Sequence, residues 1–339
     1  MKLLSKFKQM STQDKINFSQ IVVILPVVLI SIPTCFTRKS HFPDEYYPDP
    51  KTLLWVTIPF ILISCLRKIC TDHLFYKLGD KFLVNKPQWT KEYREFRVKR
   101  FALCLFKTIY FFFSTSFGFV LFKHEDWMPK ILFGRGKQDY KYLWESYPYQ
   151  EYNSSIEFYY IFGLGYHLHS LVFHMMSEKR GDYMENLLHH LATVFLMVFS
   201  FCNQCTRIGV LVLIVHDIVD FVLYLAKICH DLKNQVPLYF SFSLLVITYF
   251  KYRIYYFPRY IIWEATLLGN QYLPFEVPGL FTNFYLMVGL LWVLWGLHIY
   301  WFYMIIMMIV NLIKDKGNLT DPYTVVKKDE TNKNDEKIN

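Results

Sequence analysis

The chain has 339 residues, of which 53% are hydrophobic and 19% aromatic, and its formal net charge is +9. Residues 18–37 and 280–313 contain no Asp, Glu, Lys or Arg, and both runs are long enough to cross a bilayer. This composition excludes a soluble globular domain and indicates an all-α polytopic membrane protein.

The hydropathy pattern predicts eight transmembrane helices. They cover residues 18–37, 52–69, 101–122, 156–176, 185–204, 207–229, 236–257 and 280–313. Lys107 interrupts the third helix, where we expect it to snorkel to the interface or to face the protein interior. The last run is too long, because at about 1.5 Å per residue it would extend about 51 Å against about 30 Å of hydrocarbon. We expect it to tilt, to kink near Gly289 or Gly296, or to continue into the cytosol.

The distribution of charge divides the chain into three parts. Residues 1–91 hold two predicted helices and a basic cytosolic linker, residues 92–313 form a six-helix domain, and residues 314–339 form a polar tail predicted to be disordered. Cytosolic segments hold roughly twice as many Lys and Arg as lumenal ones when the N-terminus is placed in the cytosol. We therefore expect both termini to be cytosolic, and Asn153 is then the N-x-Ser/Thr sequon that faces the lumen.

Four ionisable residues inside the predicted spans stand out: His189 and His190 in the fifth helix, and Asp217 and Asp220 in the sixth. Placing an ionisable side chain in lipid costs free energy, and such residues usually mark a functional site. The two helices form a hairpin around residues 203–206, so residues equidistant from this loop lie at equal depth. His189 and Asp220 are such a pair, and Asp217 shares a helix face with Asp220. We expect all four side chains to line one chamber within the bilayer.

The chemistry of this set favours proton handling or acyl transfer. An Asp that accepts a hydrogen bond from one imidazole nitrogen leaves the other nitrogen basic, as a general base or a nucleophile requires. Adjacent His189 and His190 point about 100° apart on a helix, which disfavours a shared ion, and we expect no metal. Structural hydrogen bonding is the alternative, and Thr193 can bond locally within the same helix.

Other polar residues of these helices have simpler interpretations. His167 and His174 share a face of the fourth helix and are expected to pack. His216 neighbours Asp217 but projects from a different face. Arg207 most simply anchors the lumenal interface.

The stretch KRGDYMENLLHHLATVFLMVFSFCNQCTRIGVLVLIVHDIVDFVLYLAK at 179–227 resembles the signature region of ceramide synthases, which belong to the TLC-domain superfamily. The resemblance rests on the HH pair, the Thr206–Gly209 step, the HDxxD motif at 216–220 and the following Lys227, and it covers about 92–313. It implies six helices in a barrel around a lipid tunnel. It also implies transfer of a fatty acyl group from acyl-CoA to the amine of a sphingoid base, with His189, His190, Asp217 and Asp220 as catalytic residues.

The resemblance further implies where the substrates bind. The residues expected to bind substrate or CoA are Lys179, Arg180, Lys227, Arg207, Thr193 and His216. An apolar tunnel is expected to run from the histidines toward the lumen, where the loop at 258–279 closes it. No bound cofactor is expected, because acyl-CoA is a co-substrate. The expected location is the endoplasmic reticulum membrane. The expected partners are acyl-CoA, a sphingoid base and membrane lipids, without nucleic acid. Homo- and hetero-oligomers are both compatible with the sequence.

Two other functions compete with this interpretation. A non-catalytic TLC-domain protein, either translocon-associated or lipid-handling, would share the fold, but such relatives usually lack the complete HH and HDxxD set. A proton-coupled transporter would also place His and Asp at mid-membrane, but transporters of that kind usually show repeat symmetry and broken helices, and the sequence has no internal repeat.

Overall fold

The computed structural model describes residues 49–84, 89–137, 139–151, 153–177, 181–230, 232, 236–273 and 280–314. Several sequence predictions fall outside these residues. They are the first membrane helix at 18–37, the disordered tail beyond Lys314, and the CoA-binding candidates Lys179 and Arg180.

The described residues are helical apart from their connections, with one isolated β-bridge between Leu83 and Leu232. The elements are η2 (Pro50–Val56), α3 (Thr57–Ile69), η3 (Cys70–Phe75), α4 (Tyr76–Phe82), α5 (Lys91–Phe122), η4 (Lys130–Leu132), α6 (Lys141–Trp144), α7 (Ser154–Met175), α8 (Tyr183–Cys202), α9 (Thr206–Cys229), α10 (Val236–Tyr249), η5 (Phe250–Ile262), α11 (Trp263–Tyr272) and α12 (Leu280–Lys314). Elements η2 and η4 are 3₁₀-helices, and η3 and η5 are π-helices. The all-α polytopic class predicted from the sequence is confirmed.

Within the described ranges, five helical stretches are long and apolar enough to cross a membrane. They are Pro50–Phe82, Lys91–Phe122, Tyr183–Cys202, Thr206–Cys229 and Thr282–Asn311, and each matches a predicted span. Two further predicted spans, 156–176 and 236–257, are helices but are not among the five. The first, α7, carries three histidines and a glutamate, and in the second the α-helix changes to a π-helix at Phe250.

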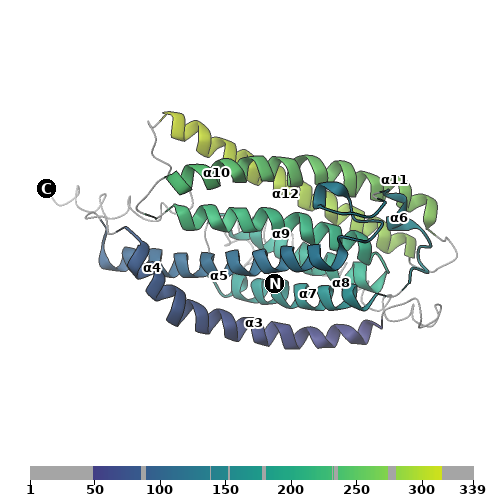
Figure 1. Ribbon diagram of the computed structural model, residues 1–339, viewed down its shortest axis with the longest axis horizontal. Helices are drawn as coiled ribbons and strands as arrows, with labels where there is room; N and C mark the ends of the chain where they lie inside the picture. Colours follow the sequence, from purple (N-terminus) through teal and green to yellow (C-terminus); the bar gives the residue numbers. More distant parts are fainter. Residues whose placement is uncertain are drawn as a thin grey trace, which may run out of the picture.

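The long helices lie side by side with roughly parallel axes, and α6 and α11 cover one end of the bundle (Figure 1). Helix α9 packs against α5, α10 and η5, while α8 packs against α7 and α12, and α12 closes the ring against η5. Helix α3 lies outside this ring, against α7. Helix α12 is one continuous α-helix that includes Gly289 and Gly296.

Local sequence signals explain where two of these helices begin. The Thr90 hydroxyl accepts a hydrogen bond from the backbone N–H of Tyr93 at 3.2 Å and caps α5. The Asn153 side chain accepts one from the N–H of Ser155 at 2.8 Å and caps α7. A side-chain acceptor at this position satisfies one of the N–H groups that the first turn leaves unpaired.

The π-helix η5 determines which way one charged side chain points. Pro258 lies inside this segment and has no backbone N–H to donate, which removes one bond of a regular α-helix. Arg253, within the same segment, is only 3% exposed and points into the bundle. Lys107 of α5 also faces inward, and its ammonium donates to the Tyr224 hydroxyl at 3.0 Å.

Candidate active site

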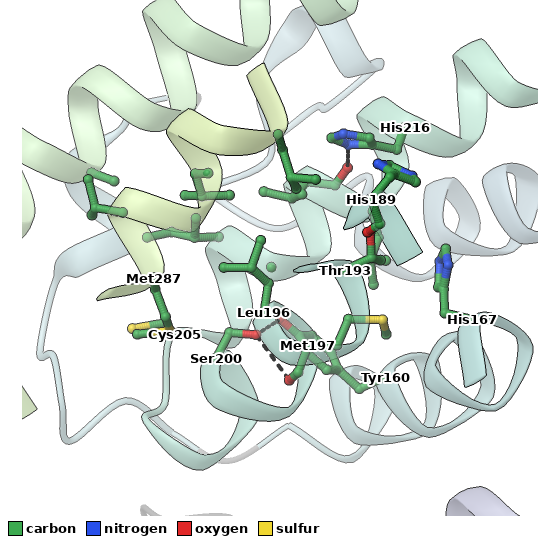
Figure 2. A pocket seen from close by; sticks show the side chains of 18 of the residues that line it. Tyr160, His167, His189, Thr193, Leu196, Met197, Ser200, Cys205, His216 and Met287 are labelled. Atoms are coloured by element: carbon green, nitrogen blue, oxygen red, sulfur yellow. Dashed lines mark hydrogen bonds between the residues drawn. The ribbon is translucent and has the colours of Figure 1, made fainter. Parts of the chain in front are cut away.

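An apolar cavity of about 70 Å³ lies inside the ring, lined by α7, α8, α9, α11 and α12. Figure 2 shows His189 and His216 together at one end, and Tyr160, Ser200 and Cys205 at the other. The second end is near the α8–α9 loop, so the cavity runs from the histidines toward the side predicted to be lumenal. That this end of the cavity faces the lumen, as expected for the tunnel, stays a prediction.

His189 is the member of the histidine pair that lines the cavity. Its ring lies 6.3 Å from the His216 ring and 5.4 Å from the Trp301 ring, measured between centroids. The Thr193 hydroxyl, which also lines the cavity, donates to the backbone carbonyl of His189 at 2.8 Å. That bond leaves the imidazole of His189 unconstrained by Thr193 and available to a molecule in the cavity.

His190 points away from the cavity toward α7. Its ring centroid lies 5.5 Å from that of His174 and 5.7 Å from that of His189. Adjacent residues on a helix differ by about 100° in direction, which explains why one imidazole of the pair faces the cavity and the other a neighbouring helix. The two histidines therefore occupy different environments.

Asp220 lines the cavity, but its carboxylate is bonded to an arginine rather than to an imidazole. Arg253 donates to Asp220 Oδ1 at 2.7 Å and to the backbone carbonyl of His216 at 3.2 Å. The Asp220 side chain is 17% exposed and that of Arg253 is 3% exposed. The sequence predicted an imidazole partner for Asp220, so this ion pair is a correction. Its physical cause is that η5 brings a guanidinium, which always carries a charge, within 2.7 Å of the Asp220 carboxylate.

Asp217 faces α5 and does not line the cavity. It is buried, and it accepts a hydrogen bond from the Ser114 hydroxyl at 2.5 Å. The prediction that all four ionisable residues line one chamber therefore holds only for His189 and Asp220. Residues four apart share a helix face more closely than residues three apart, and the residue that lines the cavity beside Asp220 is His216.

The structure also reveals functional candidates that the sequence analysis missed. His298 of α12 is completely buried, and its ring lies 4.9 Å from the His216 ring and 6.2 Å from the His189 ring. Arg253 of η5, buried and paired with Asp220, is the second such residue. The position of His298 in a run of 34 residues without formal charge could have indicated its role. The position of Arg253 within the predicted span 236–257 could have indicated its role. His167, expected to pack, is buried and also lines the cavity.

The remaining binding candidates are spread along α9. Lys227 is near its end, where the ammonium lies over the Tyr224 ring at 5.1 Å. Arg207 is at its start, where the guanidinium donates to the backbone carbonyl of Tyr142 at 2.7 Å. Twenty residues of helix separate them by about 30 Å, so the structure does not bring Arg207 and Lys227 together around one headgroup. Within the described residues, no group of three or more His, Cys, Asp or Glu side chains has the geometry to hold a metal ion.

Comparison with known proteins identifies relatives of the whole bundle. Residues 100–307 match the family model of the TLC domain. The mouse protein named ceramide synthase 4 is 29% identical over 228 residues, which are 66% of this chain and 53% of the mouse protein. A tomato protein named ASC1-like protein is 26% identical over 290 residues, 82% of this chain and 92% of its own length. The Arabidopsis protein named ceramide synthase 1 LOH3 is 26% identical over 298 residues, 83% of this chain and 92% of its own.

These matches differ in how much of each relative they cover. The chain spans about half the length of the mouse relative and nearly all of the two plant relatives. The matched residues include both the HH and the HDxxD motifs. The resemblance to ceramide synthases that these motifs indicated is confirmed.

Proposed function

This chain belongs to the TLC domain family, and on that premise we propose that it is a ceramide synthase. The reaction transfers a fatty acyl group from acyl-CoA to the amine of a sphingoid base. The observation that carries the proposal is the position of His189, whose imidazole faces an apolar cavity inside the helical ring. Both substrates carry long apolar chains, and this cavity places an apolar lining beside an imidazole.

We assign His189 the central chemical role. During the reaction the C–S bond of the thioester breaks, a C–N bond forms, and the CoA thiolate receives one of the protons that the amine loses. A positioned imidazole can remove a proton from the amine, or it can first accept the acyl group and then pass it on. Enclosure among helices excludes water, which limits hydrolysis of the thioester.

The two acids act through the scaffold in this proposal. Asp220 and Arg253 tie α9 to η5, and Asp217 and Ser114 tie α9 to α5. His190 supports the site by packing between α8 and α7. Because Asp220 offsets the charge of Arg253, the imidazoles are not left beside an uncompensated cation.

We place the substrates by charge and polarity. CoA is polyanionic and is expected at the end of the bundle that carries Lys227, with Lys179 and Arg180 in the preceding connection between α7 and α8. The acyl chain extends from His189 past Leu196 and Met197. The acyltransferase domain is residues 92–313, the membrane is that of the endoplasmic reticulum, and both termini are cytosolic.

The test uses microsomes from cells that express the full chain, supplied with labelled acyl-CoA and a sphingoid base. Wild-type protein should form the N-acyl product, and His189→Ala should abolish it. The matched control is His169→Gln, because His169 is a buried histidine of α7 whose ring bonds to Ser64 of α3 rather than facing the cavity. A wild-type protein that forms no N-acyl product with any acyl-CoA would favour the non-catalytic lipid-handling alternative.

A second measurement separates the two roles of His189. Purified protein is mixed with acyl-CoA alone, and free CoA is followed with time. A burst of CoA close to one per active site that is absent in His189→Ala indicates that His189 accepts the acyl group. The absence of a burst, in protein that is active when the base is added, indicates that His189 acts as a base only.

A further inference from the structure

Three imidazoles from three different helices converge at one end of the cavity. His189 of α8, His216 of α9 and His298 of α12 have ring centroids separated by 6.3, 4.9 and 6.2 Å. His298 is 0% exposed. Its ring also lies 5.5 Å from the Phe257 ring. If the His298 ring only filled space, it would destabilise the fold, because burying an unpaired polar group is unfavourable.

The ring nitrogens show which atoms are available for proton transfer. Nδ1 of His216 lies 2.6 Å from the backbone carbonyl of Val212, so it carries the hydrogen and Nε2 has the lone pair. This Nε2 and both ring nitrogens of His298 are buried and make no hydrogen bond to any described residue. Buried polar atoms are nearly always hydrogen bonded, and the exceptions require an explanation.

The proposed reaction supplies that explanation through its protons. A sphingoid amine is mostly protonated near neutral pH, so it loses two protons on the way to an amide. The CoA thiolate takes one of them. The other must leave a site whose lining is mostly apolar, where few groups can accept it.

We propose that His298 is a positioning residue that acts through His216, sharing with Nε2 of that imidazole the second proton lost by the sphingoid amine. The inference rests on the proposed function. The proton passes from the amine to the His189–His216 end of the cavity, is held between His216 and His298, and returns to water when the product leaves. No bond other than N–H changes at His298.

Neighbouring groups cannot replace His298 in this role. Arg253 is a cation without acceptor capacity, and indole has only a donor, which excludes Trp301. Asp220 is engaged in its ion pair with Arg253. The His298 ring lies nearer to the His216 ring than the His189 ring does, at 4.9 Å against 6.3 Å, and neither of its nitrogens bonds to a described residue.

The experiment compares His298→Gln and His298→Leu with wild type in the full-length protein, using steady-state kinetics for both substrates. Glutamine keeps a donor and an acceptor but cannot take up a proton, and leucine removes both. The control is Ile305→Val, a mild change at another buried position of α12. We expect both His298 variants to lower kcat by at least about tenfold, with each KM within about twofold of wild type and the Ile305 control unaffected.

Three results would overturn the inference. The first is a His298→Leu variant with more than half of wild-type kcat, which would mean that the ring only packs. The second is a His298→Gln variant near wild type, which would mean that a hydrogen bond is sufficient. The third is a higher KM with kcat unchanged. If leucine prevents folding, the glutamine variant decides alone. If wild-type protein forms no ceramide, the proposed function fails and this inference fails with it. If wild-type protein is active and the His298 variants give one of the three results above, this inference fails and the proposed function stands.

Discussion

The ion pair between Asp220 and Arg253 gives a quantitative prediction for Asp220→Asn. Asparagine keeps an oxygen that can accept from Arg253 but removes the negative charge. The guanidinium, 3% exposed, is then left uncompensated inside the bundle. Breaking a buried pair in this way typically costs about 3–5 kcal/mol. Because the Asp220 side chain is 17% exposed, some solvent screening remains, and we expect a loss of stability near the lower limit, about 3 kcal/mol.

The same substitution one turn earlier is the matched control. Asp217 accepts from the Ser114 hydroxyl at 2.5 Å, and the structure shows no ion pair to it within the described residues. An amide oxygen can accept the same bond, so Asp217→Asn should cost less than about 1 kcal/mol. Each variant replaces a carboxylate of α9 with an amide, but the two losses of stability should differ by about 2 kcal/mol.

Both variants can be measured as the temperature at which half of the detergent-purified protein remains monodisperse. At roughly 2–4 °C per kcal/mol for a domain of this size, Asp220→Asn should lower it by about 6–12 °C and Asp217→Asn by at most about 4 °C. The double variant Asp220→Asn, Arg253→Gln should recover part of the loss, because the uncompensated charge is gone. Equal shifts for the two aspartates, or a double variant less stable than Asp220→Asn, would refute the argument.

Three more predictions concern the ring itself. Gly209→Ala should destabilise the fold and lower its melting temperature, because a Cβ there would lie 1.4 Å from the Tyr160 hydroxyl. Gly163→Leu should shift the N-acyl products formed from a panel of acyl-CoAs toward shorter chains, since a Cβ added there would lie 3.3 Å from the terminal methyl of the cavity-lining Met197. Unchanged product lengths would show that the cavity does not narrow. Asn153→Ala should cost about 1 kcal/mol of stability through loss of the α7 cap, measured by the same thermal assay, and no change would mean that the cap is dispensable.

Features that depend on one helix or one hairpin could be predicted from the sequence. The equal depth of His189 and Asp220 follows from counting residues on both sides of a short loop, and both residues line the same cavity. The divergence of His189 and His190 follows from the helical repeat. Neither inference needs knowledge of how distant helices pack.

Contacts between distant helices could not be predicted in this way. Asp220 and Arg253 are 33 positions apart in sequence, and the approach of Arg253 depends on a π-helical segment that shifts the direction of its side chains. His298 reaches the site because α12 packs on both α8 and η5. Hydropathy treats an isolated histidine in an apolar run as a small interruption, and it contains no information about what that histidine faces.

The HDxxD spacing has a structural consequence that residue chemistry alone does not suggest. Asp217 bonds to Ser114 of α5, and Asp220 to Arg253 of η5, so two bonds on different faces fix the rotation of α9 about its axis. Rotation by one residue, about 100°, would break both bonds at once. His216, one residue before the first acid and four before the second, is thereby held toward the cavity. On this argument the acids serve the imidazoles by orienting the helix that carries one of them, which is why two bonds to separate neighbours are more effective than a single Asp–His contact.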